Sequence, residues 1–367
     1  MTQNRAITSL HEAIAAAYRL YRERQFAEAG AQCAQILKHD PYQFDALYLN
    51  GLVAYHMGNP SAAELLIEQA CRVRPQVTRF DHMTGLLRQQ GKETWLSVRE
   101  TRLRTFYDIS RTQGFIISYP KCGRTWIRIM LGRYLLCGQE GNPLEVLRIT
   151  QANPDLPTIR ISHDDQPHLK PYTDVHEDKS MYHDKAVTFL VRDPRDVLVS
   201  YYFQYTNRGD KELANDSDFH GTLSDFIRHQ IGGIFSLVRF YNVWARNRDV
   251  PERFHLARYE DFHANTHGEF ARLIRFFGLP EFGQDAMDDA VSIGAFDNMR
   301  RLEETNALNS MQLRPPPDGD PDGFKIRRGI VGGFRDYLSE EDIAFIDDYL
   351  RTELDDFYAE YKQPSRN

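Results

Sequence analysis

A short loop between two apolar segments carries the side chains best suited to binding and chemistry. It reads PKCGRT and contains the cation Lys121, then Gly123, then the hydroxyl of Thr125. The apolar run FIISY before the loop favours a buried strand, and IRIMLGRYLL after it has the apolar spacing of a helix. A loop that joins a strand to a helix directs free backbone N–H groups and the positive end of the helix dipole toward one point. The sequence therefore predicts an anion site here, most often one for phosphate.

Three further side chains that can bind or react lie at the ends of other apolar segments. His163 follows the segment TIRIS, Arg192 follows AVTFLV, and Tyr259 ends FHLARY. These segments alternate with helical stretches, which predicts a mainly parallel sheet in an α/β domain. Because ligands of such sheets bind at the carboxyl ends of the strands, we expect these three side chains to lie with Lys121 at one edge of the sheet.

Helix-start signals follow two of the predicted strands. Asp193 and Pro194 form a common helix start, with the aspartate as N-cap and the proline at the first helical position. Thr266 and Glu269 have the spacing of a capping box, which predicts that Thr266 is the N-cap of a later helix. Both starts fit the alternation of strands and helices that an α/β domain requires.

A helical repeat precedes this domain. Small residues recur with a period of 34 residues, as in Ala17, Gly51 and Gly85, and such residues let two helices pack closely. The pattern resembles the tetratricopeptide (TPR) repeat, with two complete repeats and a third that fades after Gly85, and an ordinary helical bundle is the alternative. We expect a TPR-like all-α domain at residues 1–97, a connecting helix at 98–113 and the α/β domain at 114–367.

Composition narrows the class of protein. A chain of 367 residues with 41% hydrophobic residues can form two domains with sizeable cores. The formal net charge of −7 argues against general nucleic-acid binding, although it permits a local basic pocket. We expect no membrane span, because no apolar run approaches the roughly 18 residues that a spanning helix needs. Four cysteines without CxxC or zinc spacing predict reduced thiols, and the N-terminus lacks a signal-like run, so we expect a cytoplasmic protein.

The motifs from residue 114 to about 350 resemble, in order, those of the cytosolic-type sulfotransferases. YPKCGRTW resembles the YPKSGTTW loop that binds the 5′-phosphosulfate of 3′-phosphoadenosine-5′-phosphosulfate (PAPS). FLVRDPRDVLVSYY resembles the family's 3′-phosphate-binding segment, and FKIRRGIVGGF resembles its RKGxxGDW element. Three weaker motifs complete the match. RISHDD resembles the segment with the catalytic histidine, and ARYEDF resembles the segment with the adenine-contacting tyrosine. AFDNMRR resembles the segment whose Phe and Met line the adenine pocket. The resemblance implies a P-loop-like, mainly parallel sheet flanked by helices.

The resemblance also implies roles for individual residues. His163 would accept the proton of the acceptor, Lys121 would stabilise the leaving group, and Ser200 would contact this lysine and the 3′-phosphate. The implied co-substrate is PAPS, the nucleotide product is 3′,5′-ADP, the acceptor carries a hydroxyl or an amine, and no metal is required. The implied binding set for PAPS is Lys121, Cys122, Gly123, Arg124, Thr125, Trp126, Arg192, Ser200, Tyr259, Phe296, Met299, Arg327, Arg328 and Gly329.

Two other functions remain as alternatives, and a few residues depart from the family pattern. An ATP-dependent phosphotransferase would need the order GxxxxGK[ST], whereas Lys121 precedes its glycine. A TPR scaffold with an inactive nucleotide-binding fold would not need the intact reactive residues. Among the departures, Arg124 replaces a frequent Thr, Gly294 stands where a Thr is common, and Cys122 is expected to be a packed side chain rather than a nucleophile. For the repeats, packing on the catalytic domain and binding of a protein that carries the acceptor both remain open.

Overall fold

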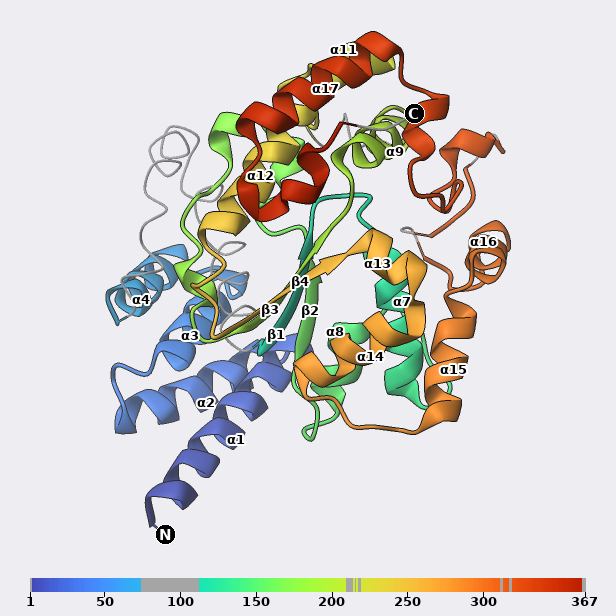
Figure 1. Cartoon of the computed structure of the whole chain (residues 1–367). Coiled ribbons are helices and arrows are strands. Elements are labelled where there is room, and N and C mark those ends of the chain that lie inside the picture. The colour runs from blue at the N-terminus through green and yellow to red at the C-terminus, as the bar shows by residue number, and fades with distance from the viewer. Residues whose placement is uncertain are drawn as a thin grey trace. The chain divides into compact units, whose positions relative to one another are not determined.

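The computed structural model describes residues 2–73, 112–208, 214, 216, 219–310, 313–316 and 319–364. The chain divides into two compact units, Met1–Arg111 and Thr112–Asn367 (Figure 1). The third repeat and nearly all of the predicted connecting helix lie outside the described residues.

The N-terminal unit contains two helix pairs. They are α1 (Thr2–Arg22) with α2 (Phe26–His39), and α3 (Phe44–His56) with α4 (Pro60–Val73). The predicted equivalent positions lie on equivalent helices and are buried: residues 17 and 51 on α1 and α3, and residues 29 and 63 on α2 and α4. A Cβ atom at Gly51 would lie 2.7 Å from Ile67 Cγ1, so a side chain there would push α3 and α4 apart. The assignment to the TPR class stays a prediction.

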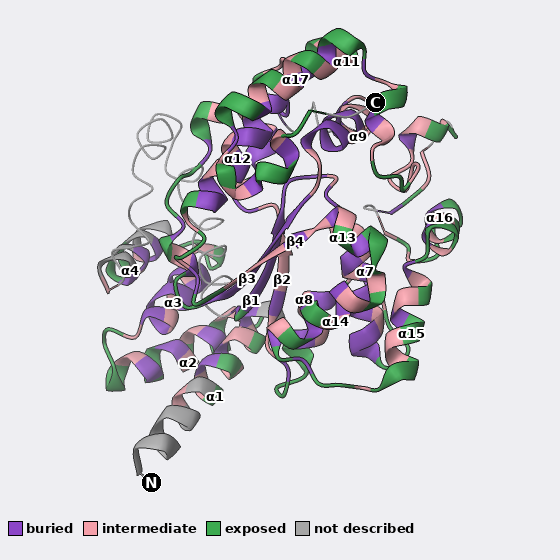
Figure 2. Cartoon of the chain, viewed as in Figure 1, coloured by how far each residue is buried: buried purple, intermediate pink, exposed green. Residues whose placement is uncertain are grey.

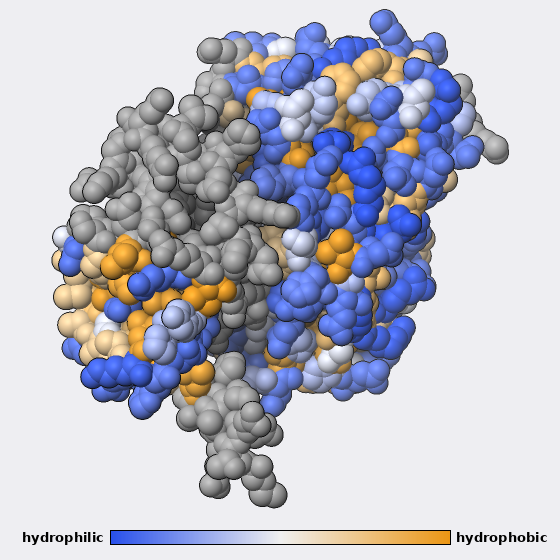
Figure 3. All heavy atoms as spheres, turned by 90° about the vertical axis from the view of Figure 1, so that its left-hand side faces the viewer, coloured by the Kyte–Doolittle hydropathy of each residue, from blue (hydrophilic) through white to orange (hydrophobic). Residues whose placement is uncertain are grey.

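Large apolar side chains also lie on the surface of this unit. Tyr42, Met57 and Leu65 are 76, 60 and 58% exposed. Figure 3 shows apolar residues gathered on the described surface of the N-terminal helices.

A parallel sheet organises the second unit, as predicted. Its strands are β1 (Gly114–Ser118), β2 (Ile159–Ser162), β3 (Ala186–Val191) and β4 (Arg253–Arg258), in the order β2-β1-β3-β4. Every residue of β1 and β3 is buried, because these strands are central and helices lie on both faces of the sheet (Figures 1 and 2). Ile117 pairs with Ser162 on β2 and with Phe189 on β3, so the carboxyl ends of these strands lie level with one another.

Helices follow the strands and cover the sheet. In Figure 1, α7, α8, α14 and α15 lie on one side of the sheet, and α9, α12 and α17 lie on the other. The α-helices are α7 (Arg124–Leu136), α8 (Val146–Ala152), α9 (Pro194–Asn207), α11 (Leu223–Ile227), α12 (Ile234–Arg246), α13 (Tyr259–Ala264), α14 (Thr266–Phe277), α15 (Gln284–Ile293), α16 (Phe296–Glu304) and α17 (Glu340–Glu353). Short 3-10 helices are η2 (Pro167–Leu169), η3 (Tyr172–Asp174), η4 (Ser180–Tyr182), η5 (Pro321–Gly323), η6 (Gly333–Asp336) and η7 (Asp356–Lys362).

One of the two predicted helix starts is confirmed and the other is wrong. Asp193 caps α9 by accepting a hydrogen bond from the backbone N–H of Arg195 at 2.9 Å, with Pro194 at the first position. The N-cap of α14 is Asn265, whose side chain accepts from the Gly268 N–H at 3.0 Å, and not Thr266. The Thr266 hydroxyl instead donates to a carbonyl of α13, so the close succession of two helices moved the cap by one residue.

Candidate active site

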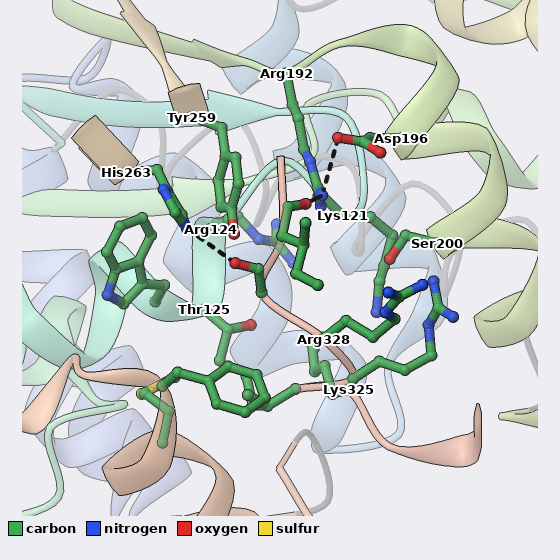
Figure 4. Close-up of a pocket in the computed structure, with 18 of the residues that line it drawn as sticks. Lys121, Arg124, Thr125, Arg192, Asp196, Ser200, Tyr259, His263, Lys325 and Arg328 are labelled. Carbon is green, nitrogen blue, oxygen red and sulfur yellow. Dashed lines mark hydrogen bonds and ion pairs between the residues drawn. The ribbon is translucent and has the colours of Figure 1, made fainter. Parts of the chain in front are cut away.

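A pocket of about 380 Å³ lies at the carboxyl ends of the strands. Each strand is followed by a loop or helix that contributes to the lining. Among the contributed residues are Lys121 after β1, His163 after β2, Arg192 after β3 and Tyr259 after β4. Figure 4 shows several of the lining side chains pointing into this space. Because the strands are parallel, four segments far apart in the sequence deliver their side chains to one place.

The structure brings nearly all of the predicted site residues to this pocket. Cys122 is the exception, since it is buried and its Sγ lies 3.4 Å from the Tyr241 hydroxyl. Burial raises the pKa of the Cys122 thiol to about 12, so the side chain is packed and uncharged. The predicted residues that line the pocket are Lys121, Gly123, Arg124, Thr125, Trp126, His163, Arg192, Ser200, Tyr259, Phe296, Met299, Arg327, Arg328 and Gly329.

The loop before α7 has a backbone that few residues could adopt. Gly123 is the N-cap of α7 with φ of 94°, and a Cβ there would lie 2.7 Å from Tyr259 Cδ2. Lys121 has a positive φ of 69°. Its ammonium Nζ lies 3.4 Å from Oε1 of Gln204. Gln204 follows Ser200 by one helical turn on α9. This loop holds the lysine and the first N–H groups of α7 at the floor of the pocket.

The environment of Lys121 makes its charge easy to remove. Burial, and then the positive charge of Arg208, lower the pKa of the Lys121 ammonium to about 7. Arg327 and Arg192 act in the same direction, while Glu303 opposes them. An anion bound beside Lys121 would reverse this shift, so the lysine can hold or release a proton near neutral pH.

His163 is oriented by a backbone contact. Its Nδ1 lies 2.8 Å from the carbonyl oxygen of Ser118 at the end of β1, so Nδ1 carries the proton and Nε2 is left as the acceptor. Burial, followed by the nearby charges of Arg124, His168 and Lys325, holds the pKa of His163 well below its ordinary value. The imidazole is therefore neutral at pH 7 and able to accept a proton through Nε2.

Arg192 joins three parts of the site. Its guanidinium donates to the carbonyl oxygen of Lys121 at 3.2 Å and to that of Ile330 at 2.9 Å. It also lies 3.4 Å from the carboxylate of Asp196 and stacks 4.3 Å from the centre of the Tyr259 ring (Figure 4). The arginine thus fixes the position of the loop relative to α9 and to the segment after residue 326.

The glycine-rich end of that segment is held by Asp196, which the sequence analysis did not select. The carboxylate of Asp196 accepts hydrogen bonds from the backbone N–H of Gly332 at 2.8 Å and of Phe334 at 2.9 Å. Glu303 on α16 accepts from the N–H groups of Lys325 and Ile326 at 2.7 and 2.8 Å. Two acids on two helices therefore hold the segment 325–334 over the pocket.

The basic pair within this segment is positioned by acids and aromatic rings. Arg327 lies 3.3 Å from Asp322 and stacks 4.5 Å from the centre of the Phe203 ring. Arg328 forms an ion pair of 2.6 Å with Asp336. Each arginine keeps further N–H donors for a phosphate, because a guanidinium has five.

Aromatic side chains line the end of the pocket near β4. The rings of Trp126 and Tyr259 lie 5.6 Å apart, and Phe296 is 41% exposed at the pocket wall. A Cβ at Gly294 would lie 2.8 Å from Trp126 Nε1 and 2.7 Å from Met130 Cγ, so the threonine that is common in the family would have to displace one of these side chains. This departure from the family pattern follows from packing against α7.

Several residues that line the pocket were not predicted from the sequence. Gln204, His263 and Lys325 line the pocket together with Asp196. His263 Nε2 lies 3.0 Å from the carbonyl oxygen of Gly329, so it supports the same segment as Asp196 (Figure 4). The position of Lys325 beside the arginine pair, and of Asp196 one helical turn after Arg192, could have indicated them.

The described residues contain neither a metal-binding group nor a membrane-spanning helix. No group of three or more His, Cys, Asp and Glu side chains that could hold a metal ion occurs among them. In the same part of the chain, no helix combines the length and the apolar character that crossing a bilayer requires.

Comparisons with known proteins agree with the fold. The family model described as the sulfotransferase domain matches residues 111–358. Sulfotransferase 2B1 of Mus musculus is 25% identical in an alignment of 259 positions that covers 65% of this chain and 70% of that protein. Amine sulfotransferase of Oryctolagus cuniculus is 21% identical in an alignment of 260 positions that covers 68% of this chain and 83% of that protein. A crystal structure of the mouse sulfotransferase SULT7A1 complexed with PAP matches with a TM-score of 0.50 and 15% identity, covering 70% of this chain and 89% of that chain.

The chain therefore belongs to the sulfotransferase family, whose reaction is the transfer of a sulfuryl group. The family predicted from the motifs is confirmed, as is the α/β fold with a mainly parallel sheet.

Proposed function

We propose that the protein transfers a sulfuryl group from PAPS to an acceptor hydroxyl or amine. The observation that carries the proposal is that one pocket at the strand ends combines a phosphate-type loop, a neutral histidine and a cluster of arginines. PAPS needs two separated anion sites, because it has a 3′-phosphate of about −1.5 to −2 charge and a 5′-phosphosulfate.

The donor would be held by three groups of residues. Lys121, Gly123 and Thr125 bind the phosphosulfate, together with the N–H groups of α7. The adenine lies against aromatic and apolar side chains near β4, which are those of Trp126, Tyr259, Phe296 and Met299. The 3′-phosphate is bound by Arg192, Ser200, Arg327, Arg328 and the backbone of Gly329.

The chemical step is an in-line displacement at sulfur. The acceptor oxygen forms a bond to sulfur while its proton passes to Nε2 of His163. The bond between sulfur and the bridging oxygen breaks, and its electron pair stays on the phosphate of 3′,5′-ADP. Lys121 stabilises this developing charge and can supply a proton to it. Catalysis thus comes mainly from positioning and electrostatic stabilisation, as in phosphoryl transfer.

Ligand-induced thermal stabilisation tests the proposal directly. We expect 3′,5′-ADP to raise Tm in the absence of magnesium, because a ligand of the folded state stabilises it by mass action. 5′-AMP, which lacks the 3′-phosphate, should raise Tm much less and is the matched control. Stabilisation by ATP with magnesium alone would favour a phosphotransferase, and no response to any nucleotide would favour an inactive nucleotide-binding fold.

The lowered pKa of Lys121 predicts proton uptake when the nucleotide binds. At pH 8 most Lys121 side chains are neutral, because their pKa is about 7 in the free protein. The nucleotide phosphate raises this pKa, so binding should take up a fraction of a proton, on the order of one half or more. Calorimetry in two buffers of different ionisation enthalpy measures the uptake.

The variant Lys121→Met should abolish this uptake, while Lys170→Met, which changes a lysine paired with Asp165, should retain it. Equal uptake in wild type and Lys121→Met would assign the proton to another group.

A further inference from the structure

The proposed adenine contact Tyr259 and the proposed base His163 lie toward opposite edges of the sheet. β4, which precedes Tyr259, is one edge strand, and β2, which precedes His163, is the other. Helix α7 spans the distance between them with two different faces. Trp126 packs against Tyr259 and Phe262 on the β4 side, at ring distances of 5.6 and 6.2 Å. The aromatic part of the pocket is therefore on this side of α7.

The other face of α7 carries two arginines toward His163. Arg128 donates to the carbonyl oxygen of Ile161 on β2 at 3.4 Å. Arg124 lies one helical turn earlier on the same face, because residues four apart are neighbours on a helix. It lines the pocket together with His163 and Lys325. The β2 end of the pocket is therefore rich in positive charge.

Within the part of the chain that the structure describes, two of these cations have no counter-charge: the Arg124 guanidinium and the Lys325 ammonium have no hydrogen bond or ion pair. The arginines assigned to the 3′-phosphate differ, since each pairs with an acid: Arg192 with Asp196, Arg327 with Asp322 and Arg328 with Asp336. An unpaired, partly buried cation costs free energy that an anionic ligand can offset.

The titration behaviour agrees with this geometry. Burial, followed by the charge of Arg128, lowers the pKa of Arg124 to about 9. Burial, followed by Lys121 and Arg124, holds the pKa of Lys325 well below its ordinary value. The donor phosphosulfate already has Lys121, Thr125 and the α7 N–H groups on its side of the loop. A second anion on the His163 side would offset the charges that remain.

We propose that the acceptor itself carries a fixed negative charge, a carboxylate, phosphate or sulfate ester, which Arg124 and Lys325 bind so that its reacting group lies beside His163. This inference rests on the proposed sulfuryl transfer. Its consequence is a substrate class: anionic hydroxyl or amine compounds are favoured over neutral ones of the same shape. Binding of the acceptor would also weaken the positive field on His163 and so strengthen the base.

A matched pair of phenols tests the proposal without knowledge of the natural acceptor. 4-Hydroxybenzoate and 4-hydroxybenzamide share a ring and a hydroxyl and differ in charge. Calorimetry of the full-length protein saturated with 3′,5′-ADP should show the benzoate binding at least about tenfold more tightly, the scale of a charge-assisted contact. The double variant Arg124→Gln/Lys325→Gln should lose this preference. It should keep its affinity for 3′,5′-ADP, because the inference assigns Arg124 to the acceptor and not to PAPS, the ligand that the motif resemblance implied for it.

A control variant removes two exposed cations elsewhere on the same unit. Arg148→Gln/Arg351→Gln changes the net charge equally, at side chains that are 82 and 65% exposed, and should keep the preference for the benzoate. Equal affinities for the two phenols, including no binding of either, would overturn the inference. A loss of 3′,5′-ADP affinity in the Arg124/Lys325 double variant would overturn it too, because it would assign these cations to the donor. Failure of wild type to bind 3′,5′-ADP would instead refute the proposed function.

Discussion

His163→Ala should reduce turnover by at least about a hundredfold and leave the affinity for 3′,5′-ADP nearly unchanged. A reduction in turnover of this size is typical of the loss of a general base. The nucleotide affinity should be nearly unaffected, because His163 follows the edge strand β2, whereas the proposed nucleotide contacts come from the segments after β1, β3 and β4 and from residues 296–329. Sulfuryl transfer from labelled PAPS to an acceptor selected from an extract or a library measures the rate.

The matched control is His183→Ala, which removes a largely exposed histidine of the same domain. It should retain wild-type turnover. A rate for His163→Ala close to that of wild type would remove this residue from the mechanism.

The same histidine sets the expected pH dependence. A base works only when deprotonated, and the pKa of His163 is held well below 6.5 by burial and by the neighbouring cations Arg124 and Lys325, with His168 contributing. The acid limb of kcat/KM should therefore lie below pH 6.5, and the rate should not fall between pH 8 and pH 7 through this group. An acid limb at or above pH 7 that disappears in His163→Gln would contradict the lowered pKa.

Arg192→Ala should weaken the binding of 3′,5′-ADP by roughly 10- to 150-fold, which corresponds to about 1.5–3 kcal/mol for a lost charge-assisted contact. The binding of 5′-AMP should weaken much less, because this nucleotide lacks the 3′-phosphate that we propose the guanidinium binds. Some loss for both nucleotides is expected from the contacts of Arg192 with the Lys121 carbonyl and the Tyr259 ring. The informative quantity is therefore the ratio of the two affinities, measured by calorimetry.

Arg192→Lys is the matched variant, because it keeps the charge and removes the forked geometry. It should give an intermediate ratio. Equal weakening of 3′,5′-ADP and 5′-AMP in Arg192→Ala would show that the 3′-phosphate binds elsewhere.

The sequence by itself determined the strands of the sheet in chain order, and it predicted half of the residues that line the pocket. Apolar runs bounded by turn residues mark β1 and β3, because a strand buried on both faces needs apolar side chains at every position. Since parallel strands end at one edge, placing Lys121, His163 and Arg192 after strands was enough to bring them together. The motif resemblance then added roles that no local pattern contains.

Only the tertiary structure decided which charges of the pocket are paired. Asp196 reaches the backbone of Gly332, 136 residues later in the chain, and Glu303 reaches that of Lys325. Local sequence carries no record of such contacts, because they form only when α9 and α16 pack beside the segment 325–334. The same packing leaves Arg124 and Lys325 without an acidic partner among the residues that the structure describes. Local apolar periodicity predicts the strands and helices. The pairing of charges depends instead on distances between segments, and these distances are set only once the chain has folded.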